Sequence, residues 1–95
     1  MKMFKTQVNE RLSHNETWAE VIEDIFTRVE GAYEYNVTSD EQIQLLHKRV
    51  VEITNESGER IAEVVVNCYL NENYDEDDLE SGKYIVEVEL IEGKE

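Results

Sequence analysis

Hydrophobic and polar side chains alternate along residues 49–54 and again along residues 60–70, two runs rich in β-branched residues. Ser57 and Gly58 lie between the runs, and glycine is favoured in the tight turn of a β-hairpin. If these two residues form the loop, Val51 pairs with Val64 on one face of the hairpin. We predict this hairpin as the element around which the rest of the chain is organised.

The register of this hairpin has one alternative. A wider loop over residues 55–58 would separate Glu52 from Glu63, which otherwise lie directly opposite each other and repel. That loop would instead set Ile53 against Arg60, a poorer separation of apolar from charged residues, so we prefer the two-residue loop. The preferred register places on the core face Leu45, His47, Arg49, Val51, Ile53, Ala62, Val64, Val66, Cys68 and Leu70. The outer face then carries Leu46, Lys48, Val50, Glu52, Thr54, Ile61, Glu63, Val65, Asn67 and Tyr69.

Residues 13–31 have the spacing of an amphipathic helix. One face of this helix would carry Trp18, Val21, Ile22, Ile25, Phe26 and Val29. Ser13 and Glu16 have the spacing of a capping box, and Gly31 stands where a left-handed residue would end the helix. The pattern therefore predicts a helix over residues 13–31, with Trp18 and Phe26 in the core.

Two further segments alternate as half-buried strands do. Residues 32–38 form the first, followed by a turn expected at residues 39–41; residues 42–46 fit a strand, which we prefer, or a helical turn. Residues 83–91 form the second, with inward side chains at Tyr84, Val86, Val88 and Leu90 and outward ones at Ile85, Glu87, Glu89 and Ile91. Residues 1–12 are ambiguous between a short edge strand and a helix, and we prefer the strand.

These elements predict a single α+β domain over residues 1–95. One N-terminal amphipathic helix would pack on a four-stranded antiparallel sheet, or a five-stranded one if the first segment joins it. The sheet would be a meander over residues 32–91, with a frayed tail at residues 92–95. The element order resembles that of cystatins and monellin in topology only, and because the inhibitor loop motifs of cystatins are absent, the resemblance implies no function and no site residue.

The chain of 95 residues is strongly acidic, with 23 acidic and 9 basic residues and a net charge of −14. Such a charge disfavours direct binding to nucleic acid or to an anionic membrane. No segment approaches the roughly 18 apolar residues that span a bilayer, and the N-terminus lacks a signal-peptide core. We therefore expect a cytoplasmic protein.

No motif in the sequence points to catalysis or to a cofactor. Cys68 is the single cysteine and lies in an apolar strand, which indicates a buried thiol. His14 and His47 have no second ligand at metal-binding spacing. Residues 71–82 alternate Asn71, Asn73, Asp75 and Asp77 as calcium ligands do, but they lack the glycine and glutamate of an EF-hand loop. We prefer a mobile loop over a weak calcium site, and a non-catalytic protein over an enzyme.

The acidic residues gather on three predicted surfaces. The outer face of the helix carries Glu16, Glu20, Glu23 and Asp24, the outer face of the sheet carries Glu52, Glu63, Glu87 and Glu89, and the loop carries Asp75, Glu76, Asp77 and Asp78. On the helix most charged pairs at i,i+3 and i,i+4 are repulsive, and only Asp24 and Arg28 attract each other. We interpret these carboxylates as binding residues for a basic protein surface.

We therefore predict a non-catalytic acidic binding protein that occupies the basic, nucleic-acid-binding surface of another protein. Its general character is similar to that of the DNA-mimic inhibitors that phages make against host enzymes. The alternative is a structural or assembly module that dimerises, or joins a complex, through the outer face of its sheet. That interface would use Val50, Ile61, Val65 and Ile85.

Overall fold

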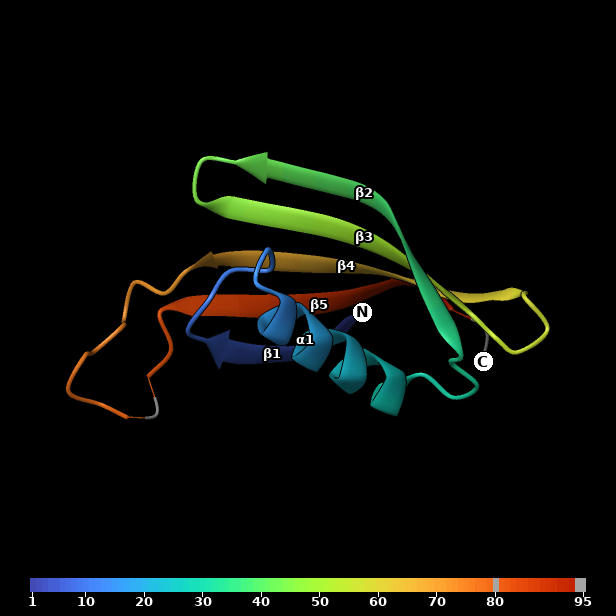
Figure 1. Cartoon of the computed structure of the whole chain (residues 1–95), viewed down its shortest axis with the longest axis horizontal. Helices are drawn as coiled ribbons and strands as arrows, with labels where there is room; N and C mark the ends of the chain where they lie inside the picture. The colour runs from blue at the N-terminus through green and yellow to red at the C-terminus, as the bar shows by residue number, and fades with distance from the viewer. Residues whose placement is uncertain (80, 94–95) are drawn as a thin grey trace.

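The computed structural model describes residues 1–79 and 81–93, which form one helix and five strands. The strands are β1 (Lys2–Val8), β2 (Glu34–Ile43), β3 (Leu46–Thr54), β4 (Arg60–Leu70) and β5 (Tyr84–Gly93). They form one antiparallel sheet in the order β1-β5-β4-β3-β2, and helix α1 (Asn15–Arg28) connects its two edge strands (Figure 1). The fold is α+β, and the ambiguous first segment is an edge strand, which makes the sheet five-stranded.

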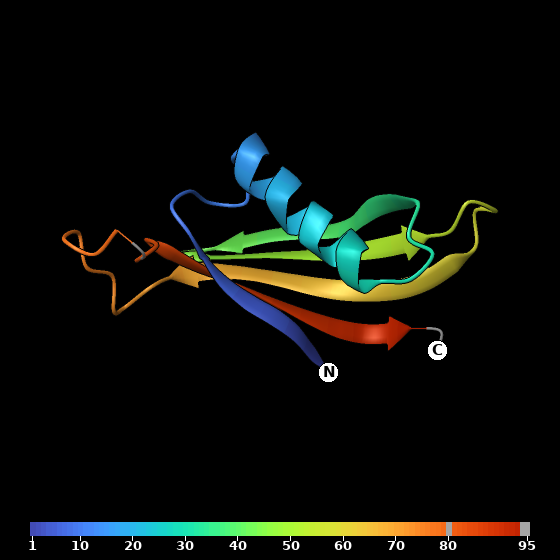
Figure 2. The same cartoon turned by 90° about the horizontal axis from the view of Figure 1, so that it is seen from below.

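The core is built from alternate strand residues and one stripe of the helix. Its fully buried members include Ile25, Val51, Ile53, Val64, Val66, Val86 and Val88. Each such side chain contributes about 1.5–3 kcal/mol by leaving water. Figure 2 shows α1 crossing one side of the sheet, which leaves the other side open. We call that second side the open face.

The β3–β4 hairpin has the predicted register but a different turn. Val51 pairs with Val64, Ile53 pairs with Ala62, and Glu52 lies opposite Glu63. The turn is one residue longer than the predicted two-residue loop. Within it the Gly58 amide donates to the Asn55 carbonyl at 3.0 Å, and Gly58 has a φ of 82°. A bulge between Ile53 and Thr54 restores the register, since Thr54 pairs with Arg60 and leaves Ile61 unpaired.

This bulge overturns the predicted position of Ile61. An extra residue interrupts the alternation of side chains, so Ile61 does not lie on the outer face. It packs against the core cluster, and its Cδ1 atom lies 3.7 Å from the position that a Cβ atom on Gly31 would take. One of the four apolar residues named for the alternative assembly interface is therefore absent from the outer face.

The turn between β2 and β3 lies at Gln44 and Leu45, not at residues 39–41 as predicted. Strand β2 continues through residues 39–41 because a bulge at Thr38, whose hydroxyl donates to the Val50 carbonyl at 3.3 Å, keeps it paired with β3. Leu45 is therefore a turn residue with 52% of its surface exposed, and Leu70, which pairs with Tyr84, is exposed as well. The prediction that Leu45 and Leu70 lie on the core face is wrong.

The ends of α1 also differ from the prediction. The N-cap residue is His14 and makes no side-chain capping bond, so the capping box of Ser13 and Glu16 does not form. The His14 amide instead donates to the Arg11 carbonyl at 2.9 Å. The helix ends at Arg28, and Gly31, with a φ of 84°, lies in the following turn.

The predicted tail at residues 92–95 is partly strand. Residues 92 and 93 extend β5 alongside β4, where Gly93 pairs with Ala62. Residues 94 and 95 lie outside the described part of the chain, so the prediction for them is untested. Within residues 1–79 and 81–93, the helix lacks the length and apolarity needed to cross a bilayer.

Candidate protein-binding surface

The predicted acidic residues of α1 form an exposed surface, which we call the helix acid row and define as Glu16, Glu20, Glu23 and Asp24. All four side chains are exposed; the three glutamates lie opposite the buried residues Val21 and Ile25, and Asp24 lies to one side. Within the described chain no ion pair neutralises any of them. The row is therefore a run of unpaired carboxylates on a folded surface.

Three of the four arginines lie on aromatic rings and form no ion pair with the helix acid row. The guanidinium groups of Arg11, Arg28 and Arg49 lie 5.5 Å from the ring centre of Tyr84, 4.7 Å from that of Phe4 and 4.5 Å from that of Trp18. Such stacking contributes about 0.5–1 kcal/mol at an exposed site. Because Arg28 stacks on Phe4, the expected attraction between Asp24 and Arg28 produces no ion pair.

The four glutamates predicted on the sheet lie on the open face, but two of them have cationic neighbours. Lys5 Nζ lies 3.5 Å from a carboxylate oxygen of Glu87, and Arg60 Nη1 lies 3.1 Å from one of Glu63. Glu52 lies beside Glu63, and Glu89 is exposed. The open face is therefore closer to charge balance than the helix acid row.

A second interaction also engages Glu87. The Tyr69 hydroxyl donates a hydrogen bond to its carboxylate from the neighbouring strand. This bond lowers the pKa of Glu87 and, together with burial, raises the pKa of Tyr69 to about 12. Glu87 is therefore part of an internal network on the open face, which makes it a poorer binding residue than the sequence suggested.

The loop between β4 and β5 presents Asp75, Glu76, Asp77 and Asp78 to solvent, at the same end of the sheet as the β2–β3 turn (Figure 1). The carboxylate of Asp75 accepts from the Asp77 amide at 3.0 Å, so it is turned back on its own loop. Glu80, which belongs to the same acidic stretch of the sequence, lies outside the described residues. These carboxylates extend the acidic surface beyond the sheet.

The base of this loop is held by Asn71, whose side chain is buried. Its Nδ2 atom donates to the Gly82 carbonyl at 2.8 Å, and its Oδ1 atom accepts from the Asn73 amide at 3.0 Å. Among the described residues no group of three or more histidine, cysteine, aspartate or glutamate side chains is placed to hold a metal ion. The alternation of residues 71–77 serves the turns of the loop.

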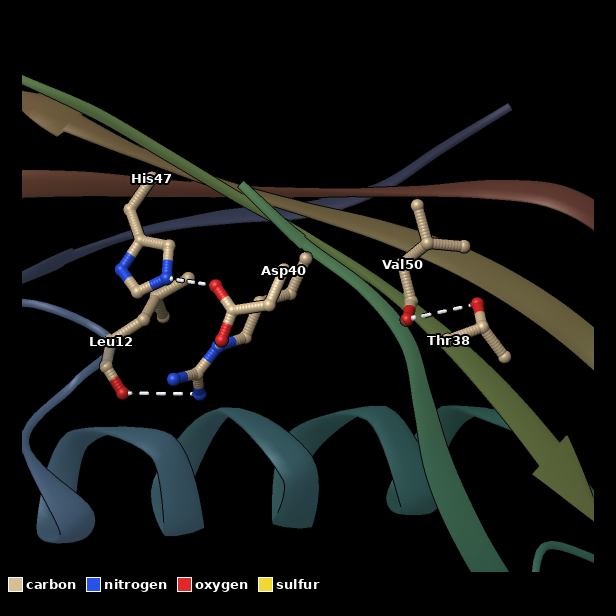
Figure 3. Close-up of polar contacts among 6 residues, drawn as sticks. Leu12, Thr38, Asp40, His47 and Val50 are labelled. Carbon is tan, nitrogen blue, oxygen red and sulfur yellow. Dashed lines mark hydrogen bonds and ion pairs between the residues drawn. The ribbon is translucent and has the colours of Figure 1, made fainter. Parts of the chain in front are cut away.

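One polar cluster that the sequence did not predict joins β2, β3 and the segment before α1 (Figure 3). The His47 Nε2 atom lies 2.6 Å from Asp40 Oδ1, and Arg49 Nε lies 3.1 Å from Asp40 Oδ2. Arg49 Nη1 also donates to the Leu12 carbonyl at 3.2 Å. The hydrogen bond from His47, followed by the positive charge of Arg49, holds the pKa of Asp40 below its ordinary value.

The imidazole of this cluster lies inside the sheet. His47 is buried, its Nδ1 atom has no partner, and it lies opposite Cys68 on the neighbouring strand. Burial raises the pKa of the Cys68 thiol, which favours the neutral form over a nucleophilic thiolate. The sequence held one signal for this cluster, the opposite charges on the two strands of the β2–β3 hairpin. Asp40 lies opposite Arg49, and Glu41 lies opposite Lys48.

Comparison with known proteins adds no family assignment. No family model matches the chain, and neither the curated proteins nor the solved structures compared with it give a significant match. The resemblance to cystatins and monellin in element order therefore stays a prediction from sequence. Any function has to be argued from the surfaces described above.

Proposed function

We propose that this protein is a non-catalytic acidic binding protein whose helix acid row occupies a basic, nucleic-acid-binding surface of another protein. The observation that carries the proposal is the separation of charge on the folded chain. Three of the four arginines lie over aromatic rings, while the carboxylates of the helix acid row form no ion pair within residues 1–79 and 81–93. A cationic partner would supply the missing countercharge.

The spacing of the carboxylates supports a partner that contacts nucleic acid. From Glu16 to Asp24 the helix rises about 12 Å, at about 1.5 Å per residue. One strand of DNA carries a phosphate about every 3.4 Å of axis, hence about 3.5 charges over the same length. The four carboxylates of the helix acid row match that density, which is about half that of the duplex.

The repulsion between carboxylates within the helix acid row also supports a basic partner. Each repulsive pair at i,i+3 or i,i+4 destabilises a helix by a few tenths of a kcal/mol, and Glu20 takes part in three such pairs, with Glu16, Glu23 and Asp24. A basic partner would convert this repulsion into attraction on binding. We assign the glutamates of the open face a lesser part in binding, because Glu63 and Glu87 already have cationic neighbours.

The alternative, assembly through the open face, loses support from the position of Ile61. The remaining apolar residues of that interface are Val50, Val65 and Ile85, all of them partly buried. The network of Lys5, Tyr69 and Glu87 lies on the same face. We therefore retain the binding function as the conclusion.

The test is affinity capture with the full chain from a lysate of its host, followed by binding measurements with the captured protein. Affinity should fall steeply between about 50 and 300 mM salt, and DNA should compete. The variant E16Q/E20Q/E23Q should weaken binding at least about tenfold, while the matched open-face variant E52Q/E63Q/E89Q should have a smaller effect. Affinity that is flat across this salt range, or unaffected by the helix variant, would rule out the proposal.

A further inference from the structure

Tyr35 packs against two aromatic rings and yet remains open to solvent. Its ring makes edge-to-face contacts with Trp18, at 6.1 Å between centroids, and with Phe26, at 6.2 Å. It is nevertheless 42% exposed, and Tyr33, two residues earlier, is 58% exposed. Aromatic side chains already held by neighbours lose little entropy on binding, which makes them effective anchors at interfaces.

The aromatic residues adjoin the helix acid row. Phe26, which contacts Tyr35, follows Glu23 by three residues, so the two side chains are neighbours on the surface of α1. Ala19, four residues before Glu23, is exposed, and its short side chain leaves the neighbouring surface uncovered. We call the surface formed by Ala19, Glu23, Phe26, Tyr33 and Tyr35 the acid–tyrosine surface.

We propose that the acid–tyrosine surface binds arginine side chains of a basic protein partner and discriminates against lysine. This inference rests on the proposed function and adds the chemistry of the partner. A guanidinium group is planar, so it can stack on an aromatic ring while its N–H groups bond a carboxylate. A lysine ammonium is a strongly hydrated point charge and gains less from such a site.

The protein contains an internal example of the same recognition. The guanidinium of Arg49 lies 4.5 Å from the ring centre of Trp18, while its Nε atom lies 3.1 Å from Asp40 Oδ2. Trp18 is one of the two rings that contact Tyr35, so the internal site and the acid–tyrosine surface share an aromatic residue. Glu23, by contrast, forms no ion pair within the described chain.

The experiment compares oligoarginine and oligolysine peptides of equal length and charge, titrated into the full chain by calorimetry at low salt. The arginine peptide should bind about three- to fivefold more tightly, the difference expected for stacking on an exposed ring. Tyr35→Leu keeps an apolar side chain against Trp18 and Phe26 but removes the ring. We expect this variant to bring the ratio of the two affinities close to one.

Tyr74→Leu is the matched control, because Tyr74 is 40% exposed and lies in the acidic loop away from α1. It should leave the ratio unchanged, with thermal unfolding of both variants recorded to verify folding. A wild-type ratio near one, a ratio that survives Tyr35→Leu, a ratio that Tyr74→Leu removes, or no binding of either peptide overturns the inference. The proposed function is decided separately by E16Q/E20Q, which leaves Glu23 of the acid–tyrosine surface in place. This variant should weaken both peptides together, and its failure to do so would count against the helix acid row whatever the ratio of the two affinities.

Discussion

The buried imidazole of His47 is hydrogen-bonded through Nε2 to the carboxylate of Asp40 at 2.6 Å. Because a carboxylate only accepts, Nε2 carries the hydrogen of this bond. Asp40 lies on the edge strand β2 and His47 on β3, so the bond ties the edge of the sheet to its interior. Arg49 then connects the same carboxylate to the Leu12 carbonyl, at the segment that leads into α1.

Replacing Asp40 by asparagine should destabilise the fold in a pH-dependent way. The folded state lowers the pKa of Asp40 from 3.8, so its contribution to stability is present at neutral pH and is lost as pH falls through the folded pKa. We expect Asp40→Asn to lower the free energy of unfolding by about 1 kcal/mol at pH 7, a value reduced for the exposure of the carboxylate. Urea unfolding across the acid range measures this, and an unchanged difference at pH 2 would contradict it.

The hydrogen bond between Tyr69 and Glu87 predicts that Tyr69 loses its hydroxyl proton at a higher pH than an ordinary tyrosine. Loss of the hydroxyl proton would break the hydrogen bond to Glu87, so this bond, together with burial and the negative charge of Glu87, raises the pKa of Tyr69 from 10.0 to about 12. The neutral form is favoured in the fold, and the stability it contributes below pH 10 should be lost as pH rises toward 12. In an ultraviolet titration of tyrosinate, Tyr69→Phe should remove the last step and Glu87→Gln should move it to lower pH. A last step that both variants leave in place would refute the assignment.

Two glycines should tolerate a methyl group differently. Gly58 has a φ of 82° and open space where a Cβ atom would lie, so Gly58→Ala should lose about 1 kcal/mol through backbone strain alone. At Gly82 an added Cβ would lie 2.7 Å from both Gln7 Cβ and the Val8 amide nitrogen of β1. Gly82→Ala should therefore lose more, about 2 kcal/mol or above, because the edge strand must move. Chemical denaturation of the two variants side by side gives the order, and the reverse order would be inconsistent with this close approach.

A charge reversal in the helix acid row should raise stability while weakening binding. Glu20→Lys turns its pairs with Glu16, Glu23 and Asp24 from repulsive to attractive, a gain of about 1 kcal/mol at low salt. The gain should shrink as salt is added. Glu72→Lys changes the net charge equally but lies in the loop after β4, so it controls for the overall charge of the protein. Thermal unfolding reports the gain, and an equal gain from both variants would show that net charge, rather than the local pairs, is responsible.

Much of the fold could be predicted from the sequence because alternate residues of each strand must be apolar to fill the core. Val51 and Ile53 face the same side as Val64 and Ala62, and slipping the pairing by one residue would expose all of them. The inward alternation of Val86 and Val88 and the buried stripe of α1 followed from the same rule. The exposure of Glu16, Glu20 and Glu23 on α1 also followed, since they lie opposite that stripe.

Only the tertiary structure decided where this alternation of inward and outward side chains is interrupted. The local sequence did not predict the bulges at Thr38 and Ile61, because the position of each bulge depends on pairing with a strand elsewhere in the chain. The bulge at Thr38 turns Asp40 toward His47 and Arg49, and the one at Ile61 moves that residue from the outer face to the core. The placement of the arginines on Tyr84, Phe4 and Trp18 was equally beyond the sequence, since each contact joins separate elements of the fold. The sequence thus determined which carboxylates lie on outward faces, and only the folded chain decided which of them have a cationic neighbour among the described residues.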